Sequence, residues 1–176
     1  EAFVRAYYRR APAADLAGRE PLDLYGAALS HRAFGRDRPA GQTRVRAFNP
    51  TFEQHGWRSP HTALEVVSDD MPFLVDSLSM ELSRRELGIH VYVHPVIGDE
   101  SFMHVELDRQ ANGLDELVAA VEHVLAQVRA AVEDWQPMRE RMAALIDEPA
   151  PPGIDVEEAR ALLAWVSDHH FTFLGY

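Results

Sequence analysis

The sequence contains no cysteine and no lysine, and all 17 of its basic residues are arginines. Without cysteine there is no disulfide framework, no thiolate nucleophile and no cysteine-based zinc site. Without lysine, neither Schiff-base nor lysine general-base chemistry is available to the chain. We therefore expect the chain itself not to be an enzyme, and we predict no catalytic residues in it.

Positive charge and long apolar runs are also scarce. The 28 acidic residues outnumber the basic ones and give a formal charge of -11, whereas a nucleic-acid surface needs clustered positive charge. No apolar run approaches the length of a membrane helix, and the first residues lack a signal-peptide pattern. Neither nucleotide-binding glycine motif occurs, so we predict no cofactor-binding residues in the chain. We expect a cytoplasmic protein with no nucleic-acid or membrane partner.

The chain of 176 residues is long enough for one ordinary core with helical additions. It begins at Glu1 and stops at Tyr176 within an apolar, aromatic run, so we expect it to be a piece of a longer polypeptide. The pattern predicts four parts: an N-terminal helical segment (1–42), a central domain (43–136), a helical extension (137–168) and the start of a further or completing strand (169–176).

The first part contains two predicted helices, at 1–10 and 21–34, and we interpret both as packing helices. Pro21 suits a first helical turn. Each helix has an apolar stripe at helical spacing, made by Phe3, Val4, Tyr7 and Tyr8 in one, and by Leu22, Tyr25, Leu29 and Phe34 in the other.

The central part alternates between strand and helix patterns. Strands are predicted at 43–48 and 62–67, and a hairpin joins a strand at 89–97 to one at 102–107. Amphipathic helices are predicted between the second and third strands and after the hairpin. This order predicts an α+β, ferredoxin-like fold with a mostly antiparallel sheet, two helices on one face, and additional N- and C-terminal helices.

A short acidic turn joins the strand at 62–67 to the following helix. Asp70 is a natural N-cap, Pro72 fits the first turn, and Gly88 suits a left-handed end of this helix. Backbone N–H groups at this helix start could hold a carboxylate while an aspartate meets an ammonium group. The candidate amino-acid site is Asp69, Asp70, Met71, Pro72, Phe73 and Asp76; the alternative is that Asp70 only caps the helix.

Histidines suggest a second site, on the sheet face opposite the helices. In the predicted hairpin His90, His94, His104 and Glu106 share this face, with Glu65 beside them. His90 and His94 are about 13 Å apart along one strand, so they cannot share a metal. We predict no metal site and expect this face to pair with another domain. His169 and His170 follow Asp168, but no nucleophile context accompanies them.

The acidic turn and the order of elements resemble the ACT domain, a family of small-molecule sensors. Longer stretches resemble the N-terminal region of the large bacterial NAD-specific glutamate dehydrogenases. They are the run 61–77, Ile89-His90 leading to His94-Pro95, and 170–176, with Ser30-His31 and Phe48-Asn49-Pro50. The resemblance implies that the parent enzyme oxidatively deaminates L-glutamate to 2-oxoglutarate with NAD, forms a homo-oligomer, and carries a distant catalytic domain.

Two departures from the ACT pattern matter. Phe73 stands where amino-acid-binding ACT turns commonly have glycine. A fourth strand is also missing after the second helix, so either 43–48 or 170–176 must complete the sheet. We expect a regulatory and assembly region whose partners are other domains and subunits of the parent, with an amino acid as effector. The alternative is a purely structural oligomerisation domain.

Overall fold

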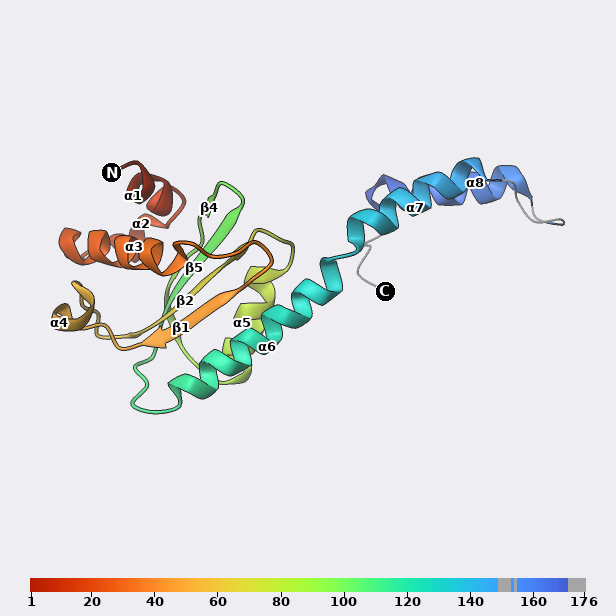
Figure 1. The fold of residues 1–176 in the computed structure, drawn as a ribbon. Coiled ribbons are helices and arrows are strands. Elements are labelled where there is room, and N and C mark those ends of the chain that lie inside the picture. Colours follow the sequence, from red (N-terminus) through yellow and green to blue (C-terminus); the bar gives the residue numbers. More distant parts are fainter. Residues whose placement is uncertain (149–152, 154, 171–176) are drawn as a thin grey trace. The chain divides into compact units, whose positions relative to one another are not determined.

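The computed structural model describes residues 1–148, 153 and 155–170 (Figure 1). The chain forms two compact units, Glu1–Ala126 and Gln127–Tyr176. Among the described residues, no helix is both long and apolar enough to cross a bilayer. The four-part division predicted from the sequence stays a prediction.

Five antiparallel strands form one sheet in the first unit. They are β1 (Arg44–Phe48), β2 (Thr62–Asp69), β3 (Ile89–Val93), β4 (Val96–Ile97) and β5 (Glu100–Leu107). The order is β1-β2-β5-β3, and β4 also pairs with β5. β1 therefore completes the sheet beside β2, one of the two alternatives left open by the sequence. The predicted strand at 89–97 is interrupted by Pro95, which has no N–H to give to a ladder.

Two longer helices cover one face of this sheet, as predicted. They are α5 (Leu74–Arg84) and α6 (Leu114–Val132), and Figure 1 shows both on the side away from the N-terminal helices. The alternating pattern of β2 places Leu64 and Val66 on this face, where both are fully buried. Leu78 of α5 and Val121 of α6 are also fully buried, so this face forms an ordinary apolar core.

The opposite sheet face is covered by the chain's own N-terminal helices, α1 (Ala2–Tyr8), α2 (Ala13–Leu16) and α3 (Pro21–Gly35). Tyr7 and Ala28 pack there against sheet residues Val67, Val93 and Phe102. Our expectation that this face pairs with another domain is therefore wrong for the part that α1 to α3 cover. A short helix, α4 (Phe52–His55), follows β1.

Helix α3 packs on the sheet mainly through small residues, and of its predicted stripe Phe34 also packs against this core. Its buried residues are Ala27, Ala28, His31 and Gly35, whereas Leu22 is 76% exposed. A Cβ at Gly35 would lie only 3.1 Å from Phe102 Cε1. The helix backbone thus approaches the sheet more closely than a leucine stripe would permit, and Leu22 and Tyr25 of the predicted stripe are exposed instead of packed.

The second unit contains two further helices, α7 (Trp135–Asp147) and α8 (Val156–Trp165). The Asp155 carboxylate caps α8 by accepting hydrogen bonds from the backbone N–H groups of Glu157 and Glu158. A π-helical turn, Val166–His170, follows α8. The remainder of the strand predicted at 170–176 lies outside the described residues.

Candidate functional site

The predicted ligand turn is tied to its surroundings by hydrogen bonds. Asp69 accepts one from Arg38 Nη2 and one from the backbone N–H of Gly41, both at 2.8 Å. The Asp70 backbone N–H donates to the Asp99 carbonyl at 3.0 Å. The Asp69 carboxylate therefore holds the loop that follows α3, which is a structural task.

Asp70 does not cap the following helix, contrary to our prediction. The N-cap of α5 is Phe73, in a left-handed conformation with φ of 67°, and no side chain caps this helix. Pro72 therefore precedes the helix instead of opening it. The far end differs too, because α5 ends at Arg84 and the left-handed residue after it is Glu86, not Gly88. At the turn before α5, Phe73 therefore adopts a backbone conformation that favours glycine.

This conformation predicts the effect of Phe73→Gly. The left-handed region costs a residue with a side chain about 1–2 kcal/mol, and glycine loses about 0.5–1 kcal/mol of chain entropy. We expect the variant to raise the free energy of unfolding by roughly 0.5 kcal/mol in urea titrations. Phe73→Ala is the matched control, since it removes the ring but keeps the strain. Equal stability of the two variants would contradict this account.

A buried ionic network lies between the sheet and the N-terminal helices. His104 of β5 stands at its centre, 2% exposed. Its Nδ1 is 3.1 Å from Glu65 Oε1 on β2, and its Nε2 is 3.6 Å from Glu106 Oε1. Register explains the first contact, because Glu65 and His104 are directly paired across the two strands. The imidazole thus lies between two buried carboxylates.

Arginines close the network at both ends. Arg46 of β1 donates from Nε to Glu65 Oε2 at 2.7 Å. Arg19, before α3, donates from Nη2 to Glu106 Oε2 at 3.0 Å, and the Ser59 hydroxyl donates to the same oxygen at 2.6 Å. The row of alternating charges therefore runs from Arg46 through both glutamates and His104 to Arg19.

His31 of α3 adds a neutral member. Its Nε2 lies 3.1 Å from the Val66 carbonyl, to which it can donate only as N–H. Its Nδ1 lies 2.7 Å from the Tyr7 hydroxyl, which then donates to it. This tautomer satisfies both ring nitrogens without a proton beyond the neutral form.

The environment separates the pKa values of the two histidines. Burial opposes the charge on His104, but the carboxylates of Glu106 and Glu65 outweigh it and raise its pKa to about 9. Burial lowers the pKa of His31 to about 4, although Glu65 acts in the opposite direction. Burial alone would raise the pKa of Glu65, yet His31, His104 and Arg46 lower it to about 2. Near neutral pH we therefore assign a charged His104, a neutral His31 and an ionised Glu65.

Three of these residues have a ligand set that a metal ion could use. Atoms of His31, Glu65 and His104 lie within 4.8 Å of one another. Each of these residues already has hydrogen-bond partners, and the guanidinium of Arg46 adjoins Glu65. A cation would have to displace the proton on His104 and lie near Arg46, so we interpret the cluster as an ion-pair network. Our prediction of no metal stays a prediction.

The predicted histidine face is only partly correct. Glu65, His104 and Glu106 do share a face, but their β3 neighbours are Val91 and Val93. A bulge between Ile89 and Val91 shifts the register. As a result His90 leaves the predicted face, and its Nε2 lies 2.7 Å from Asp108 Oδ1.

His94, the other histidine of the predicted face, lies 2.7 Å from the Ser101 hydroxyl. The network also contains four residues that were missed: His31, Arg46, Arg19 and Ser59. His31 could have been found as a polar residue in line with Ala27, Ala28 and Gly35.

Comparison with known proteins identifies relatives of this chain. The family described as glutamate dehydrogenase, ACT1 domain, matches residues 3–99. The chain is 37% identical, over an alignment of 207 residues, to an NAD-specific glutamate dehydrogenase of Halomonas elongata, covering 100% of this chain and 13% of that protein. It is 35% identical over 208 residues to the NAD-specific glutamate dehydrogenase of Pseudomonas aeruginosa, covering 99% and 13%. The chain spans only about 13% of the length of these relatives. Since the family match extends over more than half of its residues, the chain belongs to the glutamate dehydrogenase ACT1 domain family.

Proposed function

We propose that this chain is a non-catalytic regulatory and assembly region of a large NAD-dependent glutamate dehydrogenase. The parent enzyme would oxidise L-glutamate to 2-oxoglutarate with NAD bound elsewhere in its polypeptide, in the cytoplasm and as a homo-oligomer. The relatives support the parent activity, because both are named as NAD-specific glutamate dehydrogenases. Their much greater length leaves room for separate catalytic domains.

One observation carries the non-catalytic part of the proposal. The groups best suited to acid–base chemistry, His104, Glu65 and Glu106, are at most 2% exposed and are bonded to one another and to arginines. A general acid or base must come within hydrogen-bond reach of its substrate. These side chains instead join the N-terminal helices to the sheet, which is a structural role.

NADH formation tests this assignment. We expect glutamate-dependent NADH absorbance from the full-length parent enzyme and none from the 176-residue chain. In the parent, Glu65→Gln combined with Glu106→Gln should break the network and change the oligomeric mass or the response to effectors. Glu122→Gln, on the exposed side of α6, is the matched control. Glutamate-dependent NADH formation by the chain alone would refute the proposal.

An amino-acid effector at the acidic turn is a second part of the proposal. It is favoured by the start of α5, where no side chain caps the leading N–H groups, so these can donate hydrogen bonds to a ligand carboxylate. The exposed Asp70 and Asp76 would then meet the ammonium group, while Asp69 remains with Arg38. Met71, Pro72 and Phe73 supply the remaining backbone of this turn.

Thermal shift with a panel of amino acids, glutamate included, tests this site. We expect one or more amino acids to raise the melting temperature, because a ligand that binds only the folded state stabilises it. The shift should disappear in the Asp70→Ala, Asp76→Ala double variant. No shift with any amino acid would favour the purely structural alternative. Asp69→Ala is not a suitable probe, since it also breaks the loop contacts.

A further inference from the structure

Trp57 carries a buried hydrogen-bond donor that no described residue satisfies. The residue is 1% exposed and packs in one cluster with Ala27 and Ala63. Its indole Nε1 forms no hydrogen bond within the described part of the chain. Buried tryptophan N–H groups usually have a partner, and one without a partner requires an explanation. The acceptor of this N–H group therefore comes from solvent or from a bound molecule.

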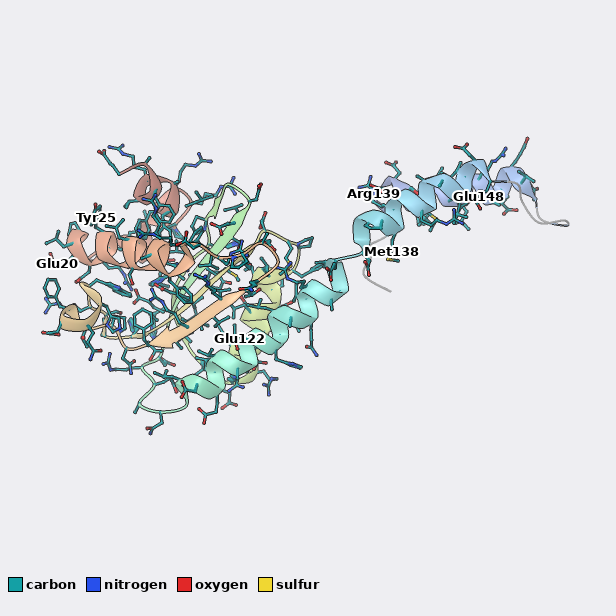
Figure 2. All side chains as sticks on the ribbon, in the orientation of Figure 1. Glu20, Tyr25, Glu122, Met138, Arg139 and Glu148 are labelled. Atoms are coloured by element: carbon teal, nitrogen blue, oxygen red, sulfur yellow. The ribbon has the colours of Figure 1, made fainter. Side chains whose placement is uncertain are left out.

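Trp57 lines a pocket of about 440 Å³ between α3 and the loop that follows α4, which we call the Trp57 pocket. This volume lies in the range of small-molecule sites, which combine apolar walls with a few polar groups. Leu24, Ala27 and Pro60 supply apolar wall. Glu20 borders the pocket at the surface, and Figure 2 shows it where α3 begins. The Trp57 pocket therefore has the size and composition of a ligand site.

The charged groups in the lining do not favour an anionic ligand. Arg19 forms a two-point ion pair with Glu106. Arg58 donates its backbone N–H to Asp23 Oδ1 at 3.0 Å, and its Nε lies 3.9 Å from Asp23 Oδ2. Both arginines thus have a carboxylate partner. A ligand carboxylate would compete with these partners and meet the negative charge of Glu20 and Asp23, so an uncharged acceptor fits the indole N–H better.

Asp23 can accept a hydrogen bond from the same ligand. The distance of 3.9 Å between its Oδ2 and Arg58 Nε is too long for a hydrogen bond, which leaves this oxygen available. Asp23 is bonded to the residue that directly follows Trp57, so the carboxylate and the indole belong to neighbouring parts of the lining. The pocket therefore offers one neutral donor and one acceptor. A primary carboxamide carries the complementary pair, an acceptor oxygen and an NH₂ donor.

We propose that the Trp57 pocket binds an uncharged small molecule through a primary carboxamide group. The amide oxygen accepts a hydrogen bond from Trp57 Nε1, and the amide NH₂ group donates to the Asp23 carboxylate. The remainder of the molecule packs against Leu24, Ala27 and Pro60. No residue of the acidic turn lines this pocket. The inference therefore goes beyond the proposed function and does not depend on it.

Nicotinamide and nicotinate are matched probes for this site, because they differ only in carrying a carboxamide or a carboxylate. Nuclear magnetic resonance of the isotope-labelled 176-residue chain reports binding through the indole N–H signals of its three tryptophans. Replacing each tryptophan by phenylalanine in turn assigns these signals. We expect nicotinamide to shift the Trp57 signal with a dissociation constant in the millimolar range. Nicotinate should bind roughly tenfold more weakly or not at all, since it lacks the N–H donor.

Asp23→Ala tests the second contact. The variant should weaken nicotinamide binding roughly tenfold, because a hydrogen bond to a charged group is lost. Asp115→Ala is the matched control: like Asp23 in α3, Asp115 lies in the first turn of its helix, α6, but it does not line the pocket. The indole signals recorded without ligand verify that each variant is folded.

Three results would overturn the inference. A Trp57 signal that does not move at the highest soluble concentration of nicotinamide would mean that water alone satisfies the indole N–H. Equal binding of nicotinate would exclude the carboxamide as the recognised group, and unchanged nicotinamide binding in Asp23→Ala would exclude the contact to that carboxylate. None of these results bears on the proposed function, which the NADH and amino-acid experiments decide on their own.

Discussion

Replacement of Glu65 by glutamine is expected to lower the free energy of unfolding by about 3–5 kcal/mol, the usual cost of removing one partner from a buried ion pair. Glu65 is fully buried and bonded to both Arg46 and His104. Glutamine keeps the size and one acceptor oxygen but removes the charge. The variant therefore leaves the buried His104 and the partly buried Arg46 without this shared carboxylate.

Urea titration followed by circular dichroism measures this loss. Glu122→Gln makes the same chemical change at an exposed position of α6 and should alter stability by no more than about 0.5 kcal/mol. The difference between the two variants reports the network itself, free of any general effect of lowering the negative charge. A loss below about 1 kcal/mol in Glu65→Gln would mean that water or local rearrangement replaces the carboxylate.

Alkaline pH is expected to weaken the fold through His104. Its pKa rises from 6.5 to about 9 on folding, so the folded chain holds this proton more tightly than the unfolded chain. The resulting stabilisation is complete below about pH 6.5 and is lost as the pH rises through about 9. At about 1.4 kcal/mol per pKa unit, the loss is on the order of 3 kcal/mol.

At acidic pH the fold loses stability through groups whose pKa values are lowered by folding. The pKa of His31 falls to about 4 on folding, so the fold resists its protonation and loses stability as the pH drops from 6.5 towards 4. Glu65, with a pKa lowered to about 2, stabilises the fold above 4.5 and loses this contribution as the pH falls through 2. Together these groups place maximum stability near pH 6.5.

His104→Gln tests the alkaline part of this profile. The variant should be less stable at neutral pH, and its free energy of unfolding should change little between pH 6.5 and 9. His123→Gln, at an exposed position of α6, should retain the original alkaline slope. A His104→Gln variant with an unchanged slope would assign the titration to another group.

Periodicity predicted the strands and helices well because each side chain's exposure follows directly from local geometry. The alternation of residues 62–67 and 102–107 correctly separated Leu64 and Val66 from Glu65, and Val105 from His104 and Glu106. The α+β arrangement and the ACT family followed from these patterns together with the motif resemblance. The pairing of β1 beside β2 was one of two stated alternatives.

The errors have physical causes that periodicity does not report. A bulge after Ile89 moved His90 away from the face predicted for it, because one extra residue inverts the alternation. The prediction that Leu22 and Tyr25 of α3 pack was wrong because large residues were assumed to be the buried ones, whereas Gly35 permits a closer approach than a large residue would. The left-handed Phe73 was missed because a phenylalanine rarely occupies that conformation.

The ionic network could be predicted only in part. Two glutamates and a histidine on one sheet face were visible in the sequence, but they were considered as metal ligands or a domain contact. Arg19 and Glu106 are 87 residues apart, and no local pattern joins them. The charge state of His104 also depends on both carboxylates at once, and predicting it requires knowledge of the register of the strands.

The central position of β5 determines the order in which the strands can pair during synthesis on the ribosome. β5 pairs with β2, β3 and β4, yet it is the last of the five strands to be made. Until Glu100 to Leu107 emerge, β1 and β2 can pair, but β3 and β4 have no partner strand. Arg19 likewise lacks its partner Glu106 until β5 is made. Until β5 is made, the inner faces of α1 to α3 lack part of the sheet that covers them, a stage at which binding by a chaperone would protect the nascent chain from aggregation.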